Sequence, residues 1–285
     1  MRILIIGGSR FVGPLLVRRL LQKKHEVTVF NRGLTSPEGL EGAEFIKGDR
    51  NQPLRLHTDY DAVIDMCAYT GEHTKNALDS LDFGFFIHMG TAAAYKKTEI
   101  FPLTEDSPLG EWPLWGDYNR GKVGCELALE ESGVKYASIR PVYILGEKNY
   151  VERESFIYSS LLSGKELVLP GNGGAVVQFV FAGEVADAVA LAVEKKAKGA
   201  FNCAGGNLVT LRGLVAMMAE ICGSKAKIRT NPKADGGGFR EDEFPFANEN
   251  FICSNEKIKG LGARFGSLKE NLERDYRSFY GPTLR

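Results

Sequence analysis

Two residues in one short segment have the types and the spacing needed for acid–base chemistry. Tyr118 precedes Lys122 by four residues, and this spacing places both side chains on one face of a helix. The lysine ammonium can then favour the phenolate form of the tyrosine and make it a usable general acid or base. Thr91 is the candidate for a hydroxyl that holds the substrate oxygen, because it follows a predicted strand at 83–89. A tyrosine–lysine pair is common on helix surfaces, so its meaning depends on the segments around it.

The first thirteen residues, MRILIIGGSRFVG, predict a nucleotide-binding turn. Residues 3–6 form an apolar, β-branched run typical of a strand buried on both faces, and apolar residues then recur at helical spacing over 11–20. A strand, a glycine turn and a helix in this order present backbone N–H groups to an anion. Gly7 can form the tight turn and Gly13 can allow close helix packing, whereas Arg10 occupies the position of the usual second glycine.

Strands and helices alternate through the first 146 residues. The pattern predicts strands at 3–6, 25–32, 44–47, 61–66, 83–89 and 135–140, and helices at 11–20, 72–80 and 118–131, with a loop or one short helix at 33–42. This alternation predicts an α/β fold of the Rossmann type, a doubly wound parallel sheet with helices on both faces. Ligands of such sheets bind beyond the carboxyl ends of the strands, and the candidate residues of this chain fall there.

Glycine and proline punctuate shorter segments from Gly146 onward. Helices are predicted at 183–195, 211–221 and 268–280, a short strand at 200–202, and a loop at 231–250. We therefore expect a dinucleotide-binding domain of residues 1–146 and about 178–206. A smaller C-terminal α/β substrate-binding domain would contain about 147–177 and 207–285.

Composition argues against several classes of function. The 285 residues are 44% hydrophobic and 25% charged, as in ordinary globular proteins, and the formal net charge of +0 gives no general attraction to nucleic acid. No CxxC pair and no metal-binding histidine spacing occur, so zinc and disulfides are not expected and a reducing cytoplasm fits best. Neither a membrane-spanning apolar run nor a separate signal peptide is evident. The histidines behind this expectation are His25, His57, His73 and His88.

In combination these segments resemble the extended short-chain dehydrogenase/reductase family, which includes NAD-dependent sugar-nucleotide epimerases and dehydratases. The resemblance covers almost the whole chain and rests on GGSRFVG at 7–13, GDR at 48–50, GTAAAY at 90–95, YNRGK at 118–122, IRPVYILG at 139–146, QFVFAGEVADAV at 178–189 and FNCAGG at 201–206. It implies that Tyr118 is the catalytic acid/base, that Lys122 supports it and binds the nicotinamide ribose, and that Thr91 is the catalytic hydroxyl residue.

The resemblance also implies a cofactor site and a substrate site. The implied cofactor contacts are Gly7, Arg10, Phe11 and Val12 at the pyrophosphate, Asp49 and Arg50 near adenine, Cys67, Ala68 and Tyr69 along the channel, and Pro141 and Val142 at the nicotinamide. Tyr143 would point toward the substrate, whose pocket is expected between 147–170 and 231–246. In these segments Arg153 and Arg240 are candidates to hold a diphosphate.

The end of the second strand departs from the family pattern. Asn31 and Arg32 stand where an acidic residue would accept both ribose hydroxyls of NAD. Arg32 would attract a 2′-phosphate, which favours NADP. The alternative, in which Asn31 binds the ribose of NAD and Arg32 is solvated, stays open.

The leading hypothesis is hydride transfer at a carbinol or ketone carbon of a nucleotide sugar, as in an epimerase. Ala92 and Ala93 stand where sugar dehydratases of the family have an Asp–Glu pair, which argues against 4,6-dehydration. Three alternatives remain: an NADP-dependent reductase or dehydrogenase of this family, an RNA-binding protein of the chloroplast type with a GG(S/T)RF(I/V)G start, and a nucleotide-binding redox regulator. The neutral charge and the intact tyrosine, lysine and threonine favour an enzyme, and the family implies a homodimer through the helix of Tyr118.

Overall fold

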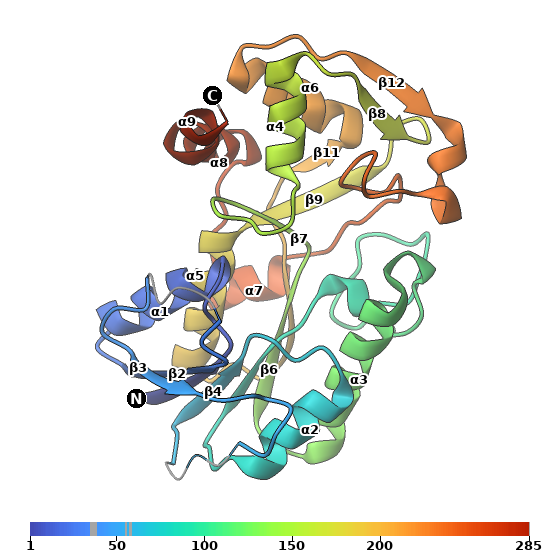
Figure 1. Cartoon of the computed structure of the whole chain (residues 1–285). Coiled ribbons are helices and arrows are strands. Elements are labelled where there is room, and N and C mark those ends of the chain that lie inside the picture. Colours follow the sequence, from blue (N-terminus) through green and yellow to red (C-terminus); the bar gives the residue numbers. More distant parts are fainter. Residues whose placement is uncertain (35–38, 55, 57–58, 285) are drawn as a thin grey trace.

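A seven-stranded parallel sheet forms the lower part of the molecule in Figure 1. Its spatial order is β10-β6-β5-β4-β1-β2-β3, which places β1 and β4 side by side at the centre. The computed structural model describes residues 1–34, 39–54, 56 and 59–284. The strands are β1 (Arg2–Ile6), β2 (Glu26–Asn31), β3 (Glu44–Lys47), β4 (Ala62–Asp65), β5 (Phe86–Met89), β6 (Tyr136–Pro141) and β10 (Gly199–Cys203).

Strand β1 is buried on both faces, as its apolar run predicts. Because side chains alternate along a strand, Ile3 and Ile5 enter one hydrophobic cluster, whereas Leu4 and Ile6 enter another on the opposite face. These four side chains are at most 1% exposed. The strand can therefore exist only with helices on both sides of the sheet.

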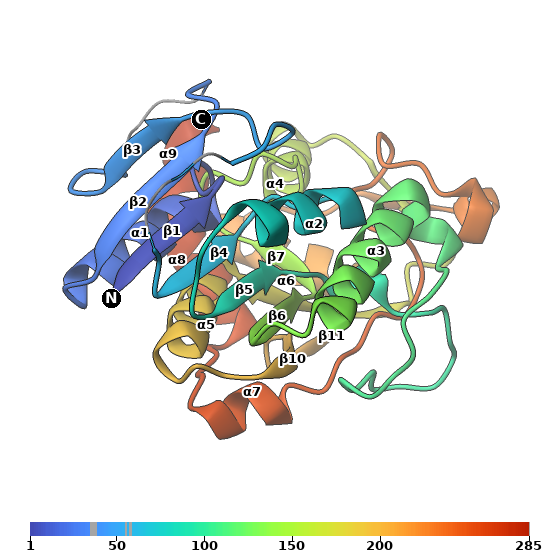
Figure 2. The same ribbon diagram turned by 90° about the horizontal axis from the view of Figure 1, so that it is seen from below.

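Helices cover both faces (Figure 2). On one face, α1 (Val12–Gln22) packs against α5 (Ala182–Glu194), and α5 also contacts α7 (Glu256–Leu261). On the other, α2 (Gly71–Ser80) packs against α3 (Gly116–Ser132). This close pairing needs glycine, since a Cβ on Gly71 would lie 2.9 Å from the carbonyl oxygen of Gly124. The predicted doubly wound α/β architecture is thus confirmed.

The upper part in Figure 1 is a smaller α/β unit. Strands β11 (Leu208–Thr210), β9 (Val176–Phe181) and β7 (Tyr143–Leu145) form one sheet, and β8 (Leu167–Pro170) pairs with β12 (Ile228–Asn231). The helices of this part are α4 (Glu154–Ser163), α6 (Leu211–Cys222), α8 (Leu268–Asp275) and α9 (Gly281–Thr283). Among the helices of the described residues, none is both long and apolar enough to cross a membrane.

The chain differs from the predicted pattern mainly in its second half. Helix α7 returns to the lower part and contacts β10, although no helix was predicted there. The short strands β7, β8, β9, β11 and β12 were also missed, because three to six residues carry little periodicity, and the longer helix α4 was missed as well. The predicted helix 268–280 ends at Asp275 and continues as a π-helical turn over Tyr276–Tyr280. Residues 35–38 of the predicted crossover and His57 lie outside the described residues.

Candidate active site

The glycine turn after β1 is packed so tightly that side chains are excluded at two positions. Gly7 has φ +90°, and a Cβ there would lie 2.9 Å from the Cys67 sulfur. A Cβ on Gly13 would lie 2.1 Å from the carbonyl oxygen of Gly8, so no residue with a side chain fits at this position. The N-terminus of α1 has no acidic residue in its first turn and no side-chain cap. The turn therefore fits the pyrophosphate of a dinucleotide, which needs free N–H groups and a close backbone approach.

Arg10 is compatible with the conformation of this turn. Its φ is not in the left-handed region, so the position of the usual second glycine accepts an L side chain here. The Arg10 side chain is exposed at the rim. The left-handed conformation falls instead on Phe11, whose φ of 53° and ψ of −102° are strained for a residue with a Cβ. Val12 begins α1 and is buried.

Helix α3 carries the predicted acid–base pair. Tyr118, in the first turn of α3, is 41% exposed, whereas Lys122 is only 3% exposed. The Lys122 ammonium donates a 2.8 Å hydrogen bond to the carbonyl oxygen of Met89 at the end of β5. It also lies 5.2 Å from the centre of the Tyr69 ring, which in turn lies 6.3 Å from the Tyr118 ring. The pair is thus held against the carboxyl ends of β4 and β5.

Asn119, which the sequence prediction missed, ties α3 to the segment of Thr91. Its buried amide donates to the carbonyl oxygens of Ala93 at 2.7 Å and Gly110 at 2.8 Å. Thr91 is 7% exposed and caps the 3-10 turn Ala92–Ala94 by accepting a hydrogen bond from the Ala93 N–H. Because that bond uses only a lone pair of the hydroxyl, its proton remains to be donated to a substrate oxygen.

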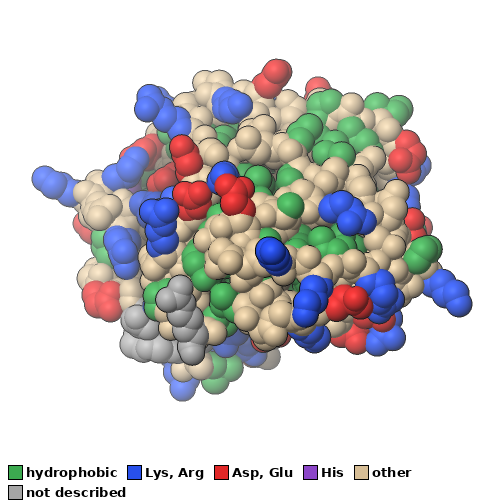
Figure 3. Space-filling model, turned by 90° about the horizontal axis from the view of Figure 1, so that it is seen from above, with side chains coloured by type: hydrophobic (Ala, Val, Ile, Leu, Met, Phe, Trp, Pro, Cys, Tyr) green, Lys and Arg blue, Asp and Glu red, His purple; other side chains and the backbone are tan. Residues whose placement is uncertain are grey.

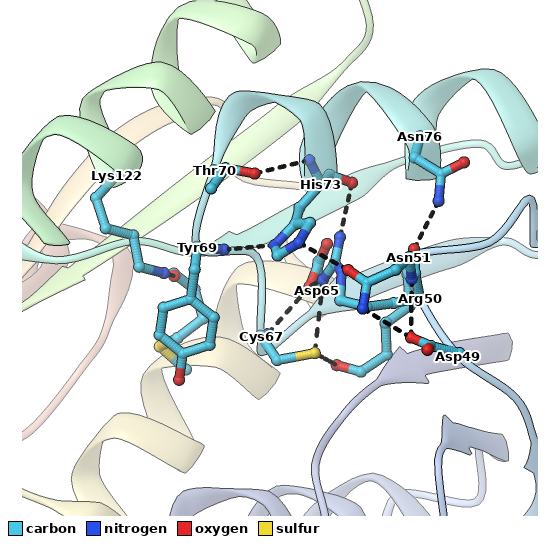
Figure 4. A network of polar contacts seen from close by, with 12 residues as sticks. Asp49, Arg50, Asn51, Asp65, Cys67, Tyr69, Thr70, His73, Asn76 and Lys122 are labelled. Atoms are coloured by element: carbon cyan, nitrogen blue, oxygen red, sulfur yellow. Dashed lines mark hydrogen bonds and ion pairs between the residues drawn. The ribbon is translucent and has the colours of Figure 1, made fainter. Parts of the chain in front are cut away.

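A buried polar network holds the loop that follows β4 (Figure 4). Arg50 donates to Asp65 and to the carbonyl oxygen of His73, both at 2.6 Å, and Asp65 also accepts the N–H of Cys67 at 3.0 Å. The Arg50 side chain is 10% exposed and that of Asp65 is 0% exposed. Burial works to lower the pKa of Arg50, but the charge of Asp65 and its hydrogen bond raise it overall. The guanidinium is therefore engaged inside the protein, and Asp49, which is exposed, is the more accessible of the two residues predicted near adenine.

His73 joins the same network to the backbone of Tyr69. Its Nδ1 accepts the N–H of Tyr69 at 3.1 Å, so the proton of the neutral ring sits on Nε2, which reaches Asn51 at 3.0 Å. Burial and the nearby Arg50 charge lower the pKa of His73. Gly121 on α3 completes this packing, since a Cβ there would lie 2.0 Å from the Tyr69 carbonyl oxygen. The structure thus brings the loop containing Cys67, Ala68 and Tyr69 against the lysine helix.

The remaining predicted cofactor residues lie at the same edge of the sheet. Asn31 bridges two turns, since its amide donates to the Gly7 carbonyl oxygen at 3.4 Å and accepts the Gly33 N–H at 2.8 Å. Arg32 is exposed beside it. Pro141 ends β6, and both Pro141 and Val142 are buried next to the segment of Thr91.

A pocket of about 240 Å³ lies between the two segments predicted to enclose a substrate. Arg153 contributes to its wall, with the guanidinium 5.3 Å from the Tyr143 ring and 5.8 Å from the Phe246 ring. Arg240, predicted with it, forms ion pairs with Asp242 and Glu243 instead. The lining residues are Trp115, Tyr143, Val151, Glu152, Arg153, Phe239, Glu241, Asp242 and Pro245. In the part of the chain that the structure describes, no three His, Cys, Asp or Glu side chains are grouped to hold a metal ion.

Comparisons with known proteins agree with this geometry. A relative from Arabidopsis thaliana, the chloroplast stem-loop binding protein of 41 kDa b, is 30% identical over 281 residues, which cover 90% of this chain and 73% of that protein. A UDP-glucose 4-epimerase of Corynebacterium glutamicum is 22% identical over 83% of this chain and 85% of its own length. The crystal structure of UDP-glucuronic acid 4-epimerase from Bacillus cereus in complex with NAD superimposes with a TM-score of 0.82, at 17% identity and full coverage of both chains.

The family assignment rests on a match through most of the nucleotide-binding part. The family model "NAD dependent epimerase/dehydratase family" matches residues 3–85 and 76–204, a stretch that contains the glycine turn, Thr91, Tyr118 and Lys122. This confirms the predicted resemblance and its class of chemistry, that of an extended short-chain dehydrogenase/reductase that uses a nicotinamide dinucleotide. The chain belongs to the NAD-dependent epimerase/dehydratase family.

Proposed function

We propose that this protein is an epimerase that inverts a hydroxyl-bearing carbon of a nucleotide sugar with the help of tightly held NAD. The observation that supports the proposal is the placement of Thr91 just after β5 and of Lys122, one helical turn after Tyr118, against the end of the same strand, at the carboxyl edge of the sheet to which the glycine turn after β1 also belongs. The relatives named UDP-glucose 4-epimerase support the choice of substrate class.

The chain's own residues divide the work as follows. Tyr118, which is accessible, takes the proton of the substrate hydroxyl and returns it at the end of the cycle. Thr91 donates a hydrogen bond to the same oxygen as it becomes a carbonyl. One N–H of the Lys122 ammonium donates to the Met89 carbonyl oxygen, and its two other N–H groups can donate to a ribose hydroxyl and to the Tyr118 oxygen. A nicotinamide bound beside these residues would supply the hydride transfer from and back to that carbon.

The choice of NAD over NADP reverses the prediction drawn from Arg32. The neighbouring Bacillus cereus structure contains NAD and so gives no support to a preference for NADP. Asn31 is already oriented by its bonds to Gly7 and Gly33, and an oriented amide at the end of β2 suits a ribose hydroxyl. Arg32 is exposed, where a solvated cation adds little.

The sugar of the substrate is proposed to enter the pocket beside Trp115 and Tyr143. The carboxylates of Glu152, Glu241 and Asp242 offer acceptors for sugar hydroxyls, and aromatic faces suit the C–H side of a sugar ring. Arg153 is the cation in this wall, so it is the candidate to approach the diphosphate.

The test compares nucleotide release with turnover. Purified protein is denatured and the released nucleotide is identified, and a panel of UDP-sugars is then assayed for epimer formation. We expect NAD near one per chain and an epimerised product, with Tyr118→Phe lowering turnover roughly 100-fold or more while NAD stays bound. Tyr136→Phe, at the start of β6 and at the other end of the strands, is the matched control. A Tyr118→Phe variant with normal turnover would remove the mechanism.

RNA binding is the second candidate, because the Arabidopsis relative is named a stem-loop binding protein. The formal net charge of +0 opposes it. On the face drawn in Figure 3, basic and acidic side chains are interspersed, with no continuous basic surface. A dissociation constant below about 10⁻⁷ M for an RNA stem-loop, with a steep salt dependence, would favour this candidate over the enzyme.

The predicted homodimer and cytoplasmic location remain proposals. Leu127 on α3 is 46% exposed and would be covered by a second copy packed on this helix. Sedimentation equilibrium of the wild type and of Leu127→Glu distinguishes a dimer through α3 from a monomer.

A further inference from the structure

Four aromatic side chains form a row across the carboxyl edge of the sheet. Phe11 belongs to the turn after β1, Tyr69 follows β4, Tyr118 lies on α3, and Tyr150 comes from the loop between β7 and α4. The Phe11 and Tyr150 rings meet edge to face at 6.1 Å, and the Tyr69 and Tyr118 rings lie 6.3 Å apart. Tyr150 lies close enough to Tyr69 that, after burial, it contributes to raising the pKa of the Tyr69 hydroxyl. We call these four side chains the aromatic row.

The position of Tyr150 is unusual because it contacts residues of two neighbouring strands at once. Strands β1 and β4 are adjacent, so a side chain that packs on Phe11 and lies near Tyr69 passes over the gap between their carboxyl ends. Tyr150 nevertheless remains 60% exposed, and Tyr69 remains 48% exposed. Burial in the core therefore does not explain why these rings associate.

Tyr69 and the loop of Tyr150 are held in place by hydrogen bonds and packing behind them. The N–H of Tyr69 is bonded to His73 (Figure 4). The Tyr69 carbonyl packs on Gly121. The loop of Tyr150 is held by Glu154, which accepts the N–H of Gly146 and, at 2.9 Å, the side-chain amide of Asn149. Ser278 donates to Glu147 at the start of the same loop. The row is thus built from a loop of the upper part anchored onto the lower part.

We infer that Tyr150, with Phe11 and Tyr69, is a cofactor-retaining clasp that closes over the dinucleotide and sets its dissociation rate. The inference rests on the proposed function, since it requires a dinucleotide along this edge. A dinucleotide that runs from the glycine turn to Lys122 must cross the line between Phe11 and Tyr69, because these residues follow the two central strands. It can leave only after Tyr150 has separated from one of them.

Retention of this kind matches the chemistry of epimerisation. An epimerase recovers its cofactor at the end of every turnover and has no need to release it, whereas a reductase must exchange it. Tyr150 is a positioning residue in this scheme, since its contacts are with other aromatic residues and not with the reacting carbon. Its loss should therefore change cofactor exchange far more than the chemical step.

The experiment measures the dissociation rate of NADH from the full-length protein by displacement with excess NAD, followed by NADH fluorescence. We expect Tyr150→Ala to accelerate dissociation roughly 5- to 30-fold, the effect of losing the ring contact with Phe11 together with the polar hydroxyl near Tyr69. Tyr150→Phe keeps the ring contact with Phe11 and loses only the hydroxyl near Tyr69, so its rate should lie between those of the wild type and Tyr150→Ala.

Tyr136→Phe, far from this edge, is the matched control and should leave the rate unchanged. Rates for both Tyr150 variants within twofold of the wild type would overturn the clasp while leaving the proposed function intact. If the wild type itself fails to bind NADH in an equilibrium titration, the clasp and the proposed function fail together. The two failures are therefore distinguished before any variant is compared.

Discussion

Replacing Arg50 by methionine should lower the free energy of unfolding by about 3–5 kcal/mol. The reason is the carboxylate of Asp65, which is 0% exposed and depends on Arg50 at 2.6 Å for its ion pair. Its Oδ2 already has no hydrogen-bond partner, so the variant would leave a charge in the interior with little compensation. Methionine fills a similar volume without a charge, so lost packing contributes little to the effect.

A double-mutant cycle separates the ion pair from the other bonds of the network. Asp65→Leu alone leaves a buried cation and should also cost about 3–5 kcal/mol. The double variant removes both charges, but it orphans the Cys67 N–H and the His73 carbonyl oxygen. These two groups together cost about 2–4 kcal/mol, so the double variant should be at least about 2 kcal/mol more stable than additivity predicts.

The assay is urea unfolding at pH 7, with the m-value fitted separately for each variant, and Arg229→Met is the control. Arg229 pairs with Glu166 at 3.0 Å, but the two side chains are 57% and 53% exposed, so its replacement should cost less than about 1 kcal/mol. NAD affinity is measured in parallel, and it should fall in Arg50→Met because the loop of Tyr69 loses its support. A cost below about 1 kcal/mol for Arg50→Met, or an additive cycle, would refute this account of the network.

Three further predictions follow from single positions. Gly13→Ala should destabilise the protein and abolish NAD binding, because the added Cβ would lie 2.1 Å from the carbonyl oxygen of Gly8. Gly260→Ala in α7 is the control: its Cβ would meet no atom within 4 Å, so this variant should be neutral or stabilising. Thermal unfolding with and without NAD compares the two variants. Arg32→Ala should leave NAD affinity within about twofold, and a much larger loss for NADP than for NAD in the same titrations would restore the NADP assignment. Burial raises the pKa of the Glu154 carboxyl to about 7, so the folded state binds this proton more tightly than the unfolded chain. The contribution of Glu154 to stability should therefore be fully present below about pH 4.5 and be lost, by about 3 kcal/mol, as pH rises through 7; the difference between wild type and Glu154→Gln in urea unfolding at several pH values should show this slope.

Local patterns were sufficient to predict most of the sheet and the helix that carries Tyr118 and Lys122. The predicted strand 44–47 has the same limits as β3. The four-residue spacing of Tyr118 and Lys122 was enough to place both side chains on one face of a helix, without any tertiary information. Gly7 and Gly13 were predicted from their place between a strand and a helix, and the space around both confirms that a side chain cannot enter. Each of these inferences concerns residues that are neighbours in the sequence.

Predictions that depend on distant partners were weaker. Arg50 was predicted near adenine, but its guanidinium turns inward to Asp65, a partner on β4 that no local pattern connects with it. Arg240 was predicted to hold a diphosphate, although the acidic residues that follow it in REDE were a visible sign of local pairing. Tyr150 was missed because its loop has no periodicity and its contacts, with Phe11 and Tyr69, span the two parts of the chain.

Lys122 offers the sharpest distinction between an enzyme and a binding protein that merely keeps the fold. The residue is 3% exposed, and no described carboxylate forms an ion pair with it, so its ammonium is held by one carbonyl oxygen and the face of Tyr69. A buried charge with so few partners lowers the free energy of unfolding. If the protein had no catalytic use for this charge, an apolar residue at the same position would make the fold more stable. Lys122→Met should therefore raise the free energy of unfolding of the cofactor-free protein by about 1 kcal/mol or more, while NAD affinity and turnover collapse. A variant destabilised by more than about 1 kcal/mol in urea unfolding would mean that Lys122 is kept for the fold, and its presence would then no longer favour an enzyme.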